Sequence, residues 1–328
     1  MKCINKMRLL CLCGIAAVFM SGCGQTVVSY DNPYDIYSTS ADYGLASEGA
    51  GSEKTYFSQN LCVADDVNIG NDTTDSQVAE GAGTFNLATN TVTYAQNIYE
   101  KLYPASTTKI LTAYIALKYG NLEDYVTVSE NAADQASDSS VCGLKAGDVV
   151  QLKDLLYGMM LKSGNDAAIA IAEHIGGSVE GFADMMNQEA LAMGASRSHF
   201  VNPNGLHNND HYTTAYDLYL IFKEAVKHEE FVDTVSSKDY TMTYTTAKKT
   251  QINEYMQSTN YYLLNEFPVP EGVVMYGGKT GTTSMAKSCL ILMTKNKKGE
   301  RFFSVVLGAE TKDMLYSSMS QLLEKTAN

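Results

Sequence analysis

Two hydrophobic patterns divide the chain into a helical middle and strand-like flanks. Apolar residues recur every three or four positions, the spacing of an amphipathic helix, in segments 106–117, 152–161, 165–176, 179–194, 213–228 and 313–326. Apolar and β-branched residues typical of strands fill segments 61–69, 83–97, 240–246, 288–294 and 301–310. The second of these has a turn signal at Thr89 and Asn90 and predicts a hairpin. Strands near both ends with helices between them predict an α+β domain that holds an α-helical insert.

Residues 1–22 have the pattern of a secretory signal. A basic start precedes an apolar stretch over residues 9–20, which is too short to span a bilayer well. The signal closes with Met-Ser-Gly-Cys, which resembles a bacterial lipobox and predicts that Cys23 is lipidated and becomes the mature N-terminus. The alternative is ordinary cleavage that leaves Cys23 as a free cysteine. We therefore expect a protein outside the cytoplasm, attached to the cell membrane as a lipoprotein.

Residues 23–56 differ in composition from the remainder of the chain. They are rich in Gly, Ser, Asp and Tyr and have no apolar period, which predicts a flexible tether. The remaining residues, 57–328, are long enough for one large domain, and the hydrophobic content of 45% supports a sizeable core.

Charge and residue counts exclude several classes of ligand. The formal net charge of −13 argues against nucleic acid as a partner. The five histidines lack metal-binding spacing, so we expect no metal and no other cofactor. Cys62, Cys142 and Cys289 are an odd number at wide spacing, which predicts buried apolar residues rather than a disulfide frame.

Candidate chemistry begins at Pro-Ala-Ser-Thr-Thr-Lys, residues 104–109, at the head of a predicted helix. Ser106 and Lys109 would lie one turn apart on one face, near the positive end of the helix dipole. A lysine whose pKa is lowered by burial can take the proton of such a serine. The pair therefore predicts a nucleophile and its base. The same spacing recurs at Ser284 and Lys287, in a predicted strand, where residues three apart point to opposite faces.

Two further short motifs follow in order. Ser163 and Asn165 stand at the head of a predicted helix, where a plain N-cap is the alternative role for the serine. The triplet Lys279-Thr280-Gly281 occurs once, before a predicted strand, and its small residues would let a strand edge approach a ligand closely. Ser-x-x-Lys, Ser-x-Asn and Lys-Thr-Gly in this order are the motif set of the penicillin-binding serine enzymes.

From about residue 60 to the C-terminus, the chain resembles the serine D-Ala-D-Ala carboxypeptidases, the low-molecular-mass penicillin-binding proteins. The blocks that carry the resemblance are YPASTTKILTAYIAL (103–117), LLYGMMLKSGNDAAIAIAE (155–173), FVNPNGLHNNDHYTTAYDL (200–218) and GGKTGTT (277–283). The resemblance implies a β-lactamase/transpeptidase-like fold, in which helices and an α-helical subdomain flank an antiparallel sheet. It also implies peptidoglycan stem peptides ending in D-Ala-D-Ala as substrates and β-lactams as covalent inhibitors.

The same resemblance implies a catalytic role for each motif serine and for the first lysine. Ser106 would attack the carbonyl of the penultimate D-Ala, and Lys109 would be the base for acylation. Ser163 would relay a proton toward the leaving D-Ala nitrogen.

The substrate-binding roles come from the resemblance too. Asn165 would hold the peptide carbonyl, while Lys279 and Thr280 would face the terminal carboxylate. Gly281 would let the strand edge come close, and the backbone N–H groups of Ser106 and Thr282 would form the oxyanion hole.

The chain departs from the family pattern in three places. Segment 308–318 lacks the arginine that often helps to hold the substrate carboxylate and contains only Lys312, so we expect this carboxylate to be held differently. Gly278 stands where an aliphatic residue usually precedes the Lys-Thr-Gly motif. The segment after Gly281 is too short for the β-rich C-terminal domain of many members, and we expect that domain to be absent.

Two alternative functions remain from the sequence. A class A-like β-lactamase shares all three motifs, but it needs a glutamate in a loop for which this chain has HFVNPNGLHNND, residues 199–210, without glutamate. A non-catalytic module that only binds muropeptides or β-lactams is the other alternative, although every motif side chain is present.

Overall fold

The computed structural model describes residues 60–70 and 79–327. Residues Phe57–Asn328 make one compact unit, and both hydrophobic core clusters lie within it. The predicted signal, the lipidation site Cys23 and the tether lie outside the described residues. In the part of the chain that is described, no helix has the length and apolar character needed to cross a membrane.

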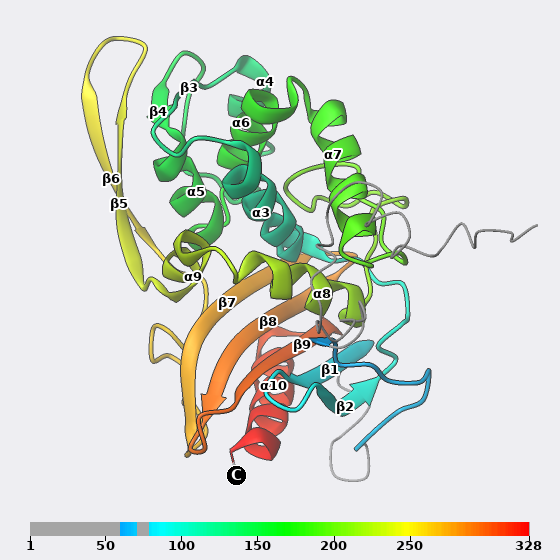
Figure 1. Cartoon of the computed structure of the whole chain (residues 1–328). Coiled ribbons are helices and arrows are strands. Elements are labelled where there is room, and N and C mark those ends of the chain that lie inside the picture. Colours follow the sequence, from blue (N-terminus) through cyan, green and yellow to red (C-terminus); the bar gives the residue numbers. More distant parts are fainter. Residues whose placement is uncertain (1–59, 71–78, 328) are drawn as a thin grey trace, which may run out of the picture. The chain divides into compact units, whose positions relative to one another are not determined.

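A five-stranded antiparallel sheet forms the centre of this unit (Figure 1). Its strands are β1 Gly81–Asn86, β2 Thr91–Gln96, β7 Val273–Thr283, β8 Lys287–Asn296 and β9 Arg301–Ala309, in the order β2-β1-β9-β8-β7. β1 pairs with β9, so the two ends of the domain meet in one sheet, as the predicted strand pattern requires. The hairpin predicted over residues 83–97 is confirmed, with its turn at residues 87–90.

One predicted strand is wrong. Within segment 61–69 only Ile69 pairs, in a single bridge with Ala95 of β2. Strand formation depends on a partner edge more than on composition, and the edge of β2 offers this segment only that one pairing.

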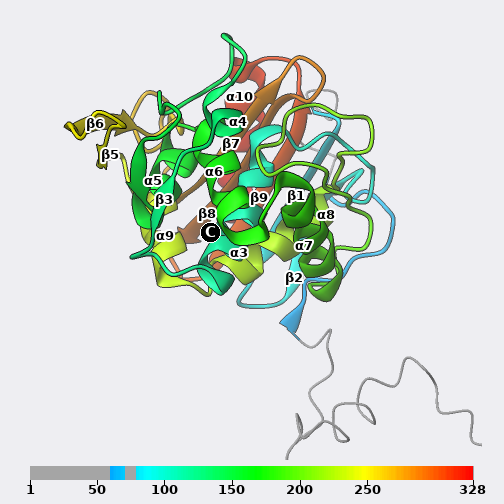
Figure 2. The ribbon, with the colours of Figure 1, turned by 90° about the horizontal axis from the view of Figure 1, so that it is seen from above.

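Helices fill the chain between β2 and β7. They are the 3₁₀ helix η3 Ala105–Thr108 and the α-helices α3 Lys109–Tyr119, α4 Glu130–Ala133, α5 Leu152–Leu161, α6 Asn165–Gly176, α7 Val179–Ala192, α8 Ala215–Ala225 and α9 Glu229–Ser236. This confirms the predicted α-helical insert. The last helix, α10 Lys312–Thr326, covers one face of the sheet while α8 covers the other (Figures 1 and 2).

The insert also contains a second sheet, most of which the sequence did not predict. Its strands are β3 Tyr125–Thr127, β4 Val149–Gln151, β5 Asp239–Thr245 and β6 Gln251–Gln257, paired in that order. Only β5 was predicted. β3 and β4 have three residues each, too few to show a period. β6 is mostly polar and exposed, so its sequence carries little apolar signal.

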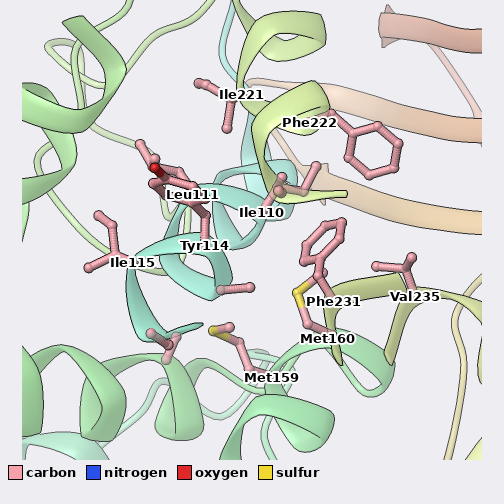
Figure 3. Close-up of a cluster of buried hydrophobic side chains, with 14 of the residues drawn as sticks. Ile110, Leu111, Tyr114, Ile115, Met159, Met160, Ile221, Phe222, Phe231 and Val235 are labelled. Atoms are coloured by element: carbon pink, nitrogen blue, oxygen red, sulfur yellow. The ribbon is translucent and has the colours of Figure 1, made fainter. Parts of the chain in front are cut away.

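Helix α3 is the centre of the larger core cluster. Every residue from Lys109 to Ala116 is buried. Figure 3 shows its apolar side chains among those of three neighbouring helices, α5, α8 and α9. Each fully buried large aliphatic or aromatic side chain contributes about 1.5–3 kcal/mol. This burial on all sides fixes the position of the first turn of α3, which carries Lys109.

Candidate active site

Ser106 and Lys109 meet across a helical joint. Ser106 lies in η3 and Lys109 begins α3, so the serine is in a 3₁₀ helix rather than in the α-helix that the sequence predicted. Residues three apart eclipse one another in a 3₁₀ helix. Lys109 Nζ lies 3.0 Å from Ser106 Oγ, which is hydrogen-bonding distance for a nucleophile and its base.

Lys109 is held by two further acceptors from distant parts of the chain. Its Nζ donates to Asn165 Oδ1 at 2.8 Å and to the backbone carbonyl of Asn204 at 2.7 Å. The side chain is 0% exposed. Burial lowers the pKa of Lys109 well below its ordinary value, and the nearby charge of Lys279 lowers it further. The lysine can therefore lose its proton far more easily than a lysine in water and can act as a base.

Lys279 and Ser163 form the second pair of the site. Lys279 Nζ donates to Ser163 Oγ at 3.1 Å and to the carbonyl of Thr280 at 3.0 Å. Burial lowers the pKa of Lys279 from 10.5 to about 7. Ser163 has a left-handed backbone, with φ of 61°, and Gly164 is the N-cap of α6, so a plain capping role for Ser163 is wrong. A non-glycine residue in this conformation often marks a functional position.

The burial of Lys279 predicts a pH-dependent cost to stability. The folded state holds this proton less tightly than the unfolded state, so the wild-type free energy of unfolding should rise with pH between about 7 and 10.5. The Lys279→Met variant lacks this proton, so its free energy of unfolding should not show this rise, which is at most about 1.4 kcal/mol per pH unit. Its stability should exceed that of the wild type most clearly near pH 7, where the wild type still has to bury the charged lysine. Urea unfolding across this pH range measures the difference. Parallel curves for the two proteins would contradict the prediction.

The two pairs lie beneath a pocket of about 220 Å³. Five of the residues predicted for the site line this pocket, namely Ser106, Ser163, Thr280, Gly281 and Thr282. The other three, Lys109, Asn165 and Lys279, are at most 4% exposed. The chain thus places hydroxyl groups on the pocket surface and the two lysine ammonium groups below them.

Strand β7 approaches Ser106 closely. A Cβ atom added at Gly281 would lie 2.8 Å from the backbone nitrogen of Ser106, so the glycine lets the strand edge reach the serine. Gly278, one of the departures from the family pattern, also has a structural reason. A Cβ there would lie 1.9 Å from the carbonyl oxygen of Ile291, and β7 has a register shift between Met275 and Gly277. An aliphatic residue does not fit at position 278 in this strand.

Loop 199–211 holds the side chain of Lys109 in place. The Asn204 carbonyl binds Lys109, and a Cβ at Gly205 would lie 1.9 Å from the carbonyl oxygen of Ala105, so only glycine fits beside η3. His211 Nδ1 accepts from the backbone N–H of Val201 at 3.1 Å, and its Nε2 lies 2.8 Å from Thr108 Oγ1. Burial lowers the pKa of His211 to about 4, so this link is neutral at physiological pH. The loop presents a backbone carbonyl to Lys109 rather than a carboxylate.

The structure adds residues that the sequence did not predict for the site. Ser140, Thr259, Tyr261 and Lys312 also line the pocket. Thr259 Oγ1 lies 2.5 Å from Thr280 Oγ1, and Lys312 Nζ lies 3.5 Å from Tyr261 Oη. None of these belongs to a motif. The missing arginine in segment 308–318 was the one sequence signal that pointed to Lys312.

Asp166 is another residue of the site that the sequence did not predict. It follows Asn165 at the start of α6 and is buried. Its carboxylate accepts the backbone N–H groups of Cys142, Gly143 and Leu144 at 2.9, 2.9 and 3.1 Å. These bonds hold the loop that carries Ser140 to the pocket.

Ser284 and Lys287, the second Ser-x-x-Lys copy, do not form a catalytic pair. The prediction that both lie in a strand was wrong. Ser284 lies in the turn between β7 and β8, and only Lys287 belongs to a strand. Lys287 forms ion pairs with Glu80 and Glu310. The three cysteines of the domain are buried free thiols, as predicted.

Comparison with known proteins agrees with this arrangement. Residues 71–311 match the model of the D-alanyl-D-alanine carboxypeptidase family, peptidase family S11. The chain belongs to this family. Its fold is accordingly close to that of the Streptomyces K15 DD-transpeptidase crystal structure, with a TM-score of 0.69 at 30% identity over 75% of this chain and 95% of that one. The predicted α+β fold class is thereby confirmed.

Relatives in the family include longer proteins. The chain is 36% identical to the D-alanyl-D-alanine carboxypeptidase DacF of Bacillus subtilis over 242 residues, which is 72% of this chain and 59% of DacF. It is 35% identical to DacC of Escherichia coli over 236 residues, 69% of this chain and 56% of DacC. The match therefore spans somewhat more than half the length of these two relatives.

Proposed function

We propose that the chain is a serine D-Ala-D-Ala carboxypeptidase that removes the terminal D-Ala from peptidoglycan stem pentapeptides. The observation that carries the proposal is the contact of Lys109 Nζ with Ser106 Oγ at 3.0 Å, beneath a pocket that the Lys-Thr-Gly strand lines. Family membership supports the same substrate class and supports β-lactams as covalent inhibitors.

The reaction follows from the two buried pairs. Ser106 Oγ attacks the carbonyl carbon of the penultimate D-Ala, and Lys109 takes the hydroxyl proton. The C–N bond then breaks, and the amine of the terminal D-Ala leaves with a proton delivered through Ser163, which Lys279 orients. Water attacks the acyl-enzyme ester and releases the shortened peptide and Ser106.

Substrate contacts follow from the groups that remain free in the site. Asn165 Oδ1 already accepts from Lys109, so the amide nitrogen of Asn165 is the group left to donate to the peptide carbonyl. The backbone N–H groups of Ser106 and Thr282 form the oxyanion hole, a feature that lowers a barrier by about 3–4 kcal/mol. The hydroxyl of Thr280 and the ammonium group of Lys312 line the pocket for the terminal carboxylate.

Fluorescent penicillin and a D-Ala assay together test the function. A carboxypeptidase becomes covalently labelled and also releases D-Ala from a stem pentapeptide. A class A-like β-lactamase would hydrolyse the penicillin and lose the label. The structure argues against this alternative, because loop 199–211 presents the Asn204 carbonyl to Lys109 instead of a carboxylate that could activate water. A binding module would release no D-Ala.

Attachment to the membrane through Cys23 is part of the proposal. The Met-Ser-Gly-Cys site and the polar segment after it support a lipid anchor with the catalytic domain outside the cytoplasm. The Cys23→Ala variant should leave the membrane fraction or remain unprocessed when cells are fractionated, because it lacks the acceptor thiol. A processed Cys23→Ala chain that stays fully in the membrane fraction after a high-salt wash would exclude this anchor.

A further inference from the structure

A second pocket lies at the end of the central sheet that is distant from Ser106. Its volume is about 430 Å³, and it forms where the β8–β9 hairpin meets β7, α9 and the C-terminal end of α8. Lys295 of β8 and Arg301 of β9 line it together with four apolar or aromatic side chains, Val226, Val232, Tyr276 and Met293. No acidic residue is among the described residues that line this pocket. We call it the hairpin pocket.

The two cations of the hairpin pocket are not neutralised. Lys295 and Arg301 stand opposite each other in the β8–β9 ladder, and like charges in this position destabilise a sheet. Within residues 60–70 and 79–327 neither side chain has a hydrogen bond or an ion pair. The nearest acid in the hairpin, Glu300, instead accepts from Asn296 Nδ2 at 2.8 Å. An arrangement that costs stability and leaves two charges free points to an anionic ligand.

The hairpin is preformed and extends this positive charge. Asn296 Oδ1 accepts the backbone N–H groups of Lys298 and Glu300, each at 3.0 Å, and fixes the turn. Lys297 and Lys298 are exposed on that turn, and Lys297 has only a 3.4 Å ion pair with Glu271, which is itself 96% exposed. Four cations thus gather in seven residues, 295–301, of a chain whose formal charge is −13.

The hairpin lies at the opposite end of the sheet from the catalytic pocket. Val274 of β7 pairs with Lys295, whereas Gly281, seven residues further along β7, lies against Ser106. This separation is about 23 Å along the strand. Figure 1 shows the β8–β9 turn at the end of the sheet away from α3. A surface that contacts the hairpin would therefore leave the catalytic pocket accessible.

We propose that the hairpin docks on an anionic phospholipid surface. Lys295 and Arg301 bind lipid phosphate. The guanidinium group of Arg301 can donate two hydrogen bonds to one phosphate, and the ammonium group of Lys295 adds a positive charge beside it. The apolar floor of the pocket faces the adjoining lipid, and Lys297 and Lys298 add attraction to neighbouring headgroups. Each cation near such a surface strengthens binding about fivefold. The proposal is independent of the peptidase activity, since none of these residues belongs to the catalytic site.

Vesicle binding tests the proposal with a matched control. The protein is a chain of residues 24–328, which lacks Cys23 and the signal but keeps the whole compact unit and both core clusters. Its binding to vesicles of phosphatidylglycerol mixed with phosphatidylcholine is compared with binding to phosphatidylcholine alone, at low and high salt. The variant K295Q/R301Q removes the pocket charges. The control K248Q/K249Q removes two lysines from the β5–β6 turn, on another exposed hairpin.

We expect the wild type to bind the anionic vesicles only, with strong salt dependence. K295Q/R301Q should bind about 25-fold more weakly, and K248Q/K249Q should bind like the wild type. Equal losses in both variants would overturn the proposal in favour of non-specific attraction, and unchanged binding in K295Q/R301Q would overturn it outright. Displacement by inorganic phosphate at low concentration would show a site for free phosphate and would also overturn docking on lipid. Penicillin labelling of each variant tests the catalytic site separately.

Discussion

Ser106→Ala and Lys109→Met should each abolish penicillin labelling and D-Ala release while the domain stays folded. In the proposed reaction, Ser106 Oγ forms the bond to the substrate, and Lys109 Nζ, which lies 3.0 Å from it, is the base. Loss of a nucleophile or its base lowers turnover by roughly 10⁶-fold in a serine hydrolase. Rates of D-Ala release and the extent of penicillin labelling give the two readouts.

The effects of these two substitutions on turnover should not add. Once the nucleophile is gone, its base has no proton to take, so the double variant should be no slower than either single variant. A double variant far slower than both would show that Lys109 acts in another step.

The second Ser-x-x-Lys copy supplies a control for this pair. Ser284→Ala changes a serine in the turn between β7 and β8 and should keep full activity. Thermal unfolding separates loss of chemistry from loss of fold. If the Ser106→Ala protein fails to fold, the Lys109→Met variant provides the test, with its activity expressed per folded protein.

Lys312→Met should reduce the preference for a pentapeptide with a free C-terminal carboxylate over its C-terminal amide. Lys312 lines the catalytic pocket beside Tyr261, in the segment where the family arginine is missing. A hydrogen bond to a charged group contributes about 1.5–3 kcal/mol, so the ratio of the two kcat/KM values should fall by roughly 10- to 150-fold. An unchanged ratio would remove Lys312 from carboxylate recognition.

Lys279 gives the comparison that sharpens this prediction. The sequence predicted that Lys279 faces the carboxylate, but its side chain is 1% exposed and its Nζ is bonded to Ser163 Oγ and the Thr280 carbonyl. We therefore expect Lys279→Met to slow both substrates by a similar factor through the proton path. A selective loss on the carboxylate substrate would instead return that role to Lys279.

A further lysine tests whether any exposed cation has the same effect. Lys101 lies outside the pocket, and its Nζ is 4.4 Å from the centre of the Tyr212 ring. Lys312 has a similar aromatic neighbour, because its Nζ is 5.4 Å from the centre of the Tyr261 ring. Lys101→Met removes a lysine in a similar setting and should leave the ratio unchanged. If it lowers the ratio as Lys312→Met does, the effect comes from net charge rather than from position.

Several features of this protein are determined locally and could be read from the sequence alone. Amphipathic spacing predicted α3, α5, α6, α7, α8 and α10, because such a helix turns an apolar stripe to the core. It missed the short helices α4 and α9. The Ser106–Lys109 pair is set within one helical turn, so its three-residue spacing was enough to predict the contact. The hairpin of β1 and β2 depends on its own turn residues, and it was predicted for the same reason.

Other features were decided only by tertiary structure, because their partners are far apart in the chain. Lys279 meets Ser163 across 116 residues, and the Asn204 carbonyl reaches Lys109 across 95. The short strands β3 and β4 form because β5 offers an edge, not because three residues carry a signal. The lowered pKa values of the two lysines are likewise a result of burial. The sequence therefore identified the candidate groups of the site, while packing decided their protonation, their partners and which of them line the pocket.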